Sequence, residues 1–158
     1  NDASSLFSRY NNNPLIISPD IPAIREKLHN YYNHIGFLFA RLISQGAKVS
    51  KSAQIGEGTI VQSMVNISSE SEIGQFVKLN TFCNVMHNCT IGDYSTIAPN
   101  AVLLGNVSVG SRCYIGSNAT ILPNITITDD VIVGAGAVVT KSIIEKGVYI
   151  GCPAKKLK

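Results

Sequence analysis

Aliphatic residues recur at a fixed interval of six in this chain. Starting at Val49, every sixth position as far as Val139 is Val, Ile or Leu. A helical stripe repeats about every 3.6 residues and a plain strand alternates every two, so neither keeps a register of six. A fixed interval held over such a length is an internal repeat, and it predicts a stacked, solenoid-like architecture.

A second periodic position supports this reading. Two residues before each aliphatic position lies a small or β-branched side chain, and Cys83, Cys89 and Cys113 all occupy such positions. Residues two apart on a strand face the same way, so each hexad predicts a short strand with two inward side chains and one outward. The rest of the hexad is read as a turn, often with Gly after the aliphatic residue. Three consecutive hexads close one triangular coil, and residues 49–144 are expected to form uninterrupted parallel coils.

The leading segment has a different pattern. Residues 1–13 are polar and predicted to be poorly ordered, residues 15–18 read as a strand, and residues 36–43 as a second strand. Between them Asp20 is the expected N-cap of a helix ending near Asn33. This β-α-β unit is too small to fold alone and reads as the tail of an α/β domain whose first half is absent. The predicted division is residues 1–46, the α/β remnant, and residues 47–158, the coils and C-terminal tail.

Composition narrows the function classes. The chain is 45% hydrophobic and 15% charged, which is ordinary for a soluble domain. No apolar run approaches the roughly 18 residues of a membrane span. A net charge of +3 does not argue for a nucleic-acid partner. The cysteines at inward positions are expected to be buried thiols, which fits a cytoplasmic location. The chain has no signal-peptide pattern and begins with Asn1 rather than Met, so we expect a natural N-terminus that was removed or left out.

The outward residues of the hexads differ between the three sides of the predicted prism. One side is polar throughout, and the other two carry exposed Ile, Tyr and Val, notably Ile60, Tyr114 and Ile132 on one and Val102 and Val138 on the other. Exposed apolar residues of this kind suggest partner surfaces, although scattered surface apolars are common. Two unlike faces that meet around an axis give a closed ring, and three-fold closure suits a triangular prism.

The coil region contains a single histidine, His87, in the segment Asn84–Gly92. The segment resembles the V-x-H-[DE]-C-x-I-G stretch of hexapeptide-repeat acetyltransferases of the sialic-acid O-acetyltransferase and bacillosamine-type nucleotide-amino-sugar N-acetyltransferase family. The resemblance covers about residues 15–157 and includes the stretches Leu104–Val107, Leu122–Asn124, Val133–Val139 and Glu145–Lys155.

The resemblance implies a mainly β fold, a left-handed parallel β-helix preceded by a partial α/β domain, and a homotrimer. It also implies transfer of an acetyl group from acetyl-CoA to a nucleotide-linked amino sugar, with His87 as general base. Asn88 stands where the family usually has Glu or Asp. The family's acetyl-CoA contacts fall at Thr96, Ser117 and Ala135, in the groove between neighbouring prisms. Thr96 departs from the family as well, because a second histidine is usual there.

Three other functions are to be weighed for a chain with this pattern. A sugar O-acetyltransferase would use the same base, and a non-catalytic trimeric scaffold would keep the prism without activity. A γ-type carbonic anhydrase needs three histidines on zinc. The chain has only His29, His34 and His87, and the first two lie in the α/β segment, so no metal site is expected.

Overall fold

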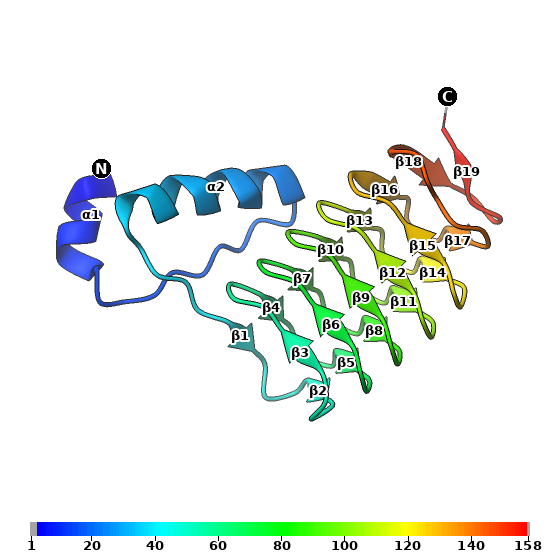
Figure 1. The fold of residues 1–158 in the computed structure, drawn as a ribbon, viewed down its shortest axis with the longest axis horizontal. Coiled ribbons are helices and arrows are strands. Elements are labelled where there is room, and N and C mark those ends of the chain that lie inside the picture. Colours follow the sequence, from blue (N-terminus) through cyan, green and yellow to red (C-terminus); the bar gives the residue numbers. More distant parts are fainter. Residues whose placement is uncertain (1–2, 158) are drawn as a thin grey trace.

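The computed structural model describes residues 3–157, and these form a parallel β-solenoid with two helices at its N-terminal end (Figure 1). Each coil contributes one short strand to each of three sheets, which we call the first, second and third faces. The first face consists of β3 (Gln54–Ile55), β6 (Glu72–Ile73), β9 (Thr90–Ile91), β12 (Ser108–Val109) and β15 (Thr126–Ile127).

The other two faces are longer. The second face consists of β1 (Leu42–Ile43), β4 (Ile60–Val61), β7 (Lys78–Leu79), β10 (Thr96–Ile97), β13 (Tyr114–Ile115), β16 (Val131–Val133), β18 (Gly147–Ile150) and β19 (Lys155–Lys156). The third consists of β2 (Lys48–Val49), β5 (Asn66–Ile67), β8 (Asn84–Val85), β11 (Val102–Leu103), β14 (Thr120–Ile121) and β17 (Val138–Val139). The pairing is parallel throughout except between β18 and β19.

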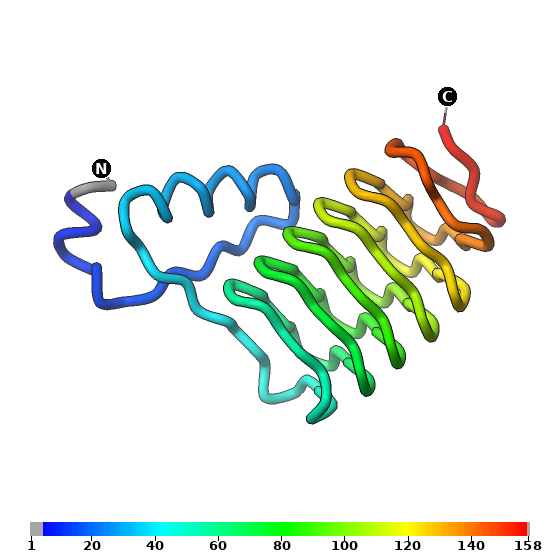
Figure 2. The backbone as a smooth tube through the Cα atoms, viewed as in Figure 1, coloured from blue at the N-terminus to red at the C-terminus, as the bar shows by residue number. Residues whose placement is uncertain are grey.

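The predicted coil of three hexads is confirmed by strand register. Asn66 pairs with Asn84, Thr96 with Tyr114, and Ser108 with Thr126, so each residue lies beside its counterpart three hexads later. The path rises without interruption through the coils in Figure 2. No α-helix interrupts residues 55–135, as expected. Strand pairing already begins at Leu42, opposite Ile60; the division of the chain at residue 46 stays a prediction.

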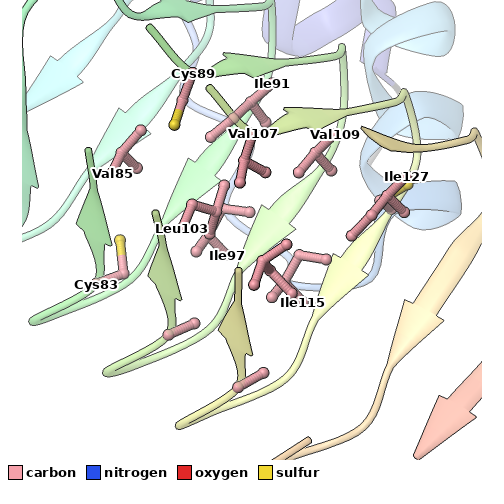
Figure 3. Close-up of a cluster of buried hydrophobic side chains, with 14 of the residues drawn as sticks. Cys83, Val85, Cys89, Ile91, Ile97, Leu103, Val107, Val109, Ile115 and Ile127 are labelled. Atoms are coloured by element: carbon pink, nitrogen blue, oxygen red, sulfur yellow. The ribbon is translucent and has the colours of Figure 1, made fainter. Parts of the chain in front are cut away.

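The interior is filled by the two inward positions of each hexad. From Val61 to Val139 every periodic aliphatic residue is buried. Figure 3 shows Val85, Ile97 and Leu103 together inside the coils with Cys83 and Cys89. Cys83, Cys89 and Cys113 are free and buried, as predicted. Burial raises the pKa of Cys83 to about 12 and that of Cys113 to about 11, so these thiols act as small apolar side chains rather than nucleophiles.

Backbone conformation at the corners has the same period of six. Every sixth residue from Gly58 to Gly136 has a positive φ, and twelve of these fourteen are not glycine. The glycines that follow the aliphatic positions are not the left-handed residues. A Cβ on Gly56 would lie 2.5 Å from the carbonyl oxygen of Gly74, so glycine there permits close approach of successive coils.

The leading segment differs from the prediction at several points. Residues 3–10, expected to be poorly ordered, form helix α1 (Ala3–Tyr10), and residues 1–2 lie outside the described part. Helix α2 (Pro22–Ile35) runs two residues further than expected, to a Gly36 cap. Its N-cap is Ile21 without a side-chain hydrogen bond, so the expectation for Asp20 was wrong. Of the two expected strands, only the bridge between Leu15 and Phe39 and the two residues of β1 form.

The start of α2 lies against the second face, where charged side chains join the two parts. Asp20 forms an ion pair with Lys78 at 2.9 Å and accepts a hydrogen bond from Asn80. Burial alone raises the pKa of Asp20, but the hydrogen bond and charge of Lys78 lower it overall. Ile60, expected to be exposed, is 5% exposed, so the chain itself covers this end of the face. Tyr114 and Ile132 lie beyond the cover and remain accessible.

Arg25 is the centre of this contact, with an exposed fraction of 0%. Its guanidinium donates to the carbonyl oxygens of Pro19, Asp20, Phe76, Tyr94 and Ser95 and to the hydroxyl of Thr96. The arrangement uses the planar fork of five donors, which lysine does not possess. Burial lowers the pKa of Arg25 to about 10, yet the group stays charged at neutral pH.

Replacing Arg25 with Met should destabilise the attachment of α2 to the coils. Several buried carbonyl oxygens would lose their donor, and each such loss costs about 1–3 kcal/mol. Urea unfolding should show a loss of at least this size, and amide exchange in α2 should accelerate more than in the coils. Arg41→Met is the matched control, because exposed Arg41 makes one bond to Ile55. Equal losses in both variants would contradict this role of Arg25.

Candidate functional site

His87 lies in the turn between β8 and β9, at the corner where the third and first faces meet. The prediction that it points outward at a corner is confirmed, because its side chain is exposed. The same corner carries Ser69 one coil earlier and Pro123 two coils later. Packing of the core therefore does not require a histidine at this position.

Asn88, the next residue, orients the imidazole. The distance from Nδ1 of His87 to Oδ1 of Asn88 is 2.9 Å. An amide oxygen only accepts hydrogen bonds, so Nδ1 is the donor in this arrangement, and Nε2 is the nitrogen that carries the lone pair whenever the ring is neutral. Asn88 has φ 58°, and asparagine tolerates this left-handed conformation better than most residues. The hydrogen bond therefore fixes the orientation of the imidazole and leaves Nε2 as the nitrogen that Asn88 does not engage.

Ser117 and Ala135 lie together, but on another corner. They occupy the turns after β13 and β16, where the second and third faces meet, and the N–H of Gly136 donates to the carbonyl oxygen of Ser117 at 2.8 Å. Ser117 is half-buried and Ala135 is exposed. The third face separates this corner from His87, so one chain does not bring the two groups together.

Thr96 is the exception among the expected contacts. It is on β10 in the second face, its exposed fraction is 0%, and its hydroxyl donates to the carbonyl oxygen of Asp20 at 2.7 Å. The expected contact between its side chain and acetyl-CoA is incompatible with this burial. The sequence pattern missed the reason, which is that the leading segment folds back over the second face.

An apolar hollow lies on the leading segment, away from His87. Its lining includes Leu6, Tyr10, Leu15, Leu28 and Phe37, from the two helices, the extended chain between them and the segment after α2. His87 by contrast stands on an open edge of the prism.

The described residues contain neither a metal-binding cluster nor a membrane-spanning helix. Within residues 3–157 no three His, Cys, Asp or Glu side chains are grouped so as to hold a metal ion. In the same range neither helix is long and apolar enough to cross a membrane.

Comparison with known proteins places the coils in a described family. The family model of the bacterial transferase hexapeptide (six repeats) matches residues 70–105 and 106–141. Among curated proteins, none matches the chain.

Several solved structures are similar over almost the whole chain. PerB from Caulobacter crescentus, in complex with CoA and GDP-perosamine, is 34% identical with a TM-score of 0.93; the match covers 99% of this chain and 75% of PerB. WeeI from Acinetobacter baumannii AYE is 31% identical with a TM-score of 0.88, over 96% of this chain and 76% of WeeI. The acetyltransferase domain of PglB from Neisseria gonorrhoeae FA1090, in complex with acetyl coenzyme A, is 29% identical with a TM-score of 0.92, over 98% and 76%.

Proposed function

The chain belongs to the hexapeptide-repeat acetyltransferases, enzymes built on a left-handed parallel β-helix, and we propose that it acetylates the amine of a nucleotide-linked amino sugar with acetyl-CoA. The substrate class is supported by PerB, which was solved with CoA and GDP-perosamine and is described as a GDP-perosamine N-acetyltransferase. The observation that carries the proposal within this chain is the exposed His87 with Nδ1 held by Asn88.

The proposed reaction is a direct transfer. The amine nitrogen of the sugar attacks the thioester carbonyl carbon, and Nε2 of His87 accepts the proton that the amine loses. The carbon–sulfur bond then breaks, the acetyl group stays on nitrogen as an amide, and the proton passes to the CoA thiolate. Backbone N–H groups in the groove would hold the developing oxyanion. No covalent enzyme intermediate is required.

Asn88 favours an amine acceptor over a hydroxyl. An uncharged amide orients the imidazole but stabilises its protonated form less than a carboxylate would. A neutral amine is already nucleophilic and needs less help from the base than a sugar hydroxyl does. The O-acetyltransferase alternative therefore suits this corner less well.

Replacing His87 with Ala should lower turnover with an amino-sugar nucleotide by roughly 10²–10⁴-fold, because the general base is removed. Acetyl-CoA binding, measured by calorimetry, should persist, since its expected contacts lie at Ser117 and Ala135. His34→Ala is the control, because His34 is exposed on α2 and remote from the corner.

Two results would decide against this proposal. Turnover of the His87→Ala variant equal to that of the parent would exclude His87 as the base. A parent protein that binds no acetyl-CoA would favour the scaffold alternative.

Replacing Asn88 with Asp tests the orienting partner. A carboxylate would stabilise the imidazolium, so a higher pH is needed before the free base is available. The acidic limb of the pH–rate profile should therefore move to higher pH, with a higher rate on the plateau. An unchanged profile would mean that residue 88 does not act on the imidazole. Asn106→Asp, at the same turn position in the next coil, is the matched control.

We further propose that the protein is a homotrimer in the cytoplasm. The corners that carry His87 and Ser117 lie on either side of the third face. A second copy packed against that face would bring the Ser117 corner of one chain to the His87 corner of the other. Such head-to-tail contacts close into a ring, and a triangular prism suits three copies. Free buried thiols are typical of a reducing compartment.

Sedimentation equilibrium at micromolar concentration should therefore give a trimer mass rather than the 16.9 kDa of one chain. Val102→Glu, on the third face, should dissociate the trimer because a charge would be buried between copies. Thr126→Glu, on the exposed first face, should leave it intact. A monomeric parent would refute the assembly.

A further inference from the structure

The imidazole of His87 rests on Gly105 of the next coil. A Cβ built on Gly105 would lie 2.6 Å from both Cε1 and Nε2 of His87, closer than side-chain atoms approach. Gly105 follows His87 by three hexads, so the two occupy the same turn position in successive coils. The backbone joins them too, because the N–H of Asn106 donates to the carbonyl oxygen of His87 at 3.0 Å.

The coil itself does not require glycine at position 105. Its φ lies outside the left-handed region, which at this corner belongs to Asn106 with φ 60°. The same turn position in the other coils is occupied by residues that all carry a Cβ, namely Lys51, Ser69, His87, Pro123 and Lys141. Those five are exposed, whereas Gly105 is buried. The ring of His87 therefore accounts for the missing side chain at this position.

We propose that Gly105 is a positioning residue, the seat on which the His87 imidazole is held for the transfer reaction. The inference rests on the proposed function of His87. Asn88 holds the ring through Nδ1 at 2.9 Å, and the neighbouring ring atoms Cε1 and Nε2 lie over the backbone at Gly105. The hydrogen bond and this close approach together limit rotation of an otherwise exposed side chain. Such preorganisation contributes to rate because a misplacement of about 1 Å can cost 10²-fold.

Gly105→Ala tests the contact between residue 105 and the His87 imidazole without removing the base. The added methyl group would meet the end of a flexible side chain, so we expect the ring to move while the coil stays folded. Turnover should fall by about 10–100-fold with the KM for acetyl-CoA unchanged. The ¹⁵N NMR signals of the His87 imidazole should shift, while those of His29 and His34 should not. Gly46→Ala, whose new Cβ would come no closer than 3.3 Å to Ser63, should match the parent in turnover and spectrum.

The double variant His87→Ala/Gly105→Ala separates positioning from direct action. If Gly105 acts through the ring, its substitution costs nothing once the ring is gone, and the double variant turns over as His87→Ala does. An equal fold-loss in both backgrounds would overturn the proposal, because Gly105 would then contact the substrate directly. Unchanged turnover and an unchanged His87 spectrum in Gly105→Ala would overturn it as well.

The spectra keep this inference distinct from the proposed reaction. If the parent transfers no acetyl group, the proposed function fails, and the His87 signals of parent and Gly105→Ala still decide whether the glycine seats the ring. Thermal unfolding midpoints of both variants, followed by circular dichroism, establish that the coils are intact.

Discussion

Closure of the coil after every third hexad is the constraint on which this structure depends. Each strand pairs with its counterpart one coil later, so one inserted residue would turn every following side chain to the wrong face. From Gly58 to Gly136 each corner also contains a left-handed residue, which costs most L-residues roughly 1–2 kcal/mol. Ladder hydrogen bonds and burial of the aliphatic positions offset this cost. Backbone strain is therefore located at the corners, and burial of the core residues holds the strand register in place.

The same constraint places the chemistry at the corners. Inward positions are committed to packing, and outward strand positions belong to flat faces. Turn residues project from the corners, and each stands directly over its counterpart in the next coil. His87 above Gly105 is one such column. Phe76 and Tyr94 form another, stacked at 5.6 Å with His29 of α2 against them, and Arg112 and Asp130 continue that column as an ion pair.

Attachment of the leading segment divides the surface of the prism. Arg25 ties α2 to the second face through backbone oxygens, which do not titrate, so the joint does not depend on a carboxylate partner for the guanidinium. The leading segment covers that end of the second face. The third face lies between the two corners that carry His87 and Ser117. In the proposed homotrimer, these two corners from neighbouring copies would together form the site.

The sequence alone determined the coils, because a period of six is visible in every hexad and each one reports the same local packing rule. Inward Cys83 and outward His87 followed from their places in that period, and the family resemblance supplied the reaction. Local patterns failed in the leading segment, where residues 3–10 form α1 and Asp20 binds Lys78 instead of capping α2. They also failed for Thr96, which is covered by the distant leading segment, and for Gly105, which is covered by a side chain of the preceding coil. Only the tertiary structure brings such distant residues into contact, because burial and close approach depend on the path of the whole chain rather than on its local period.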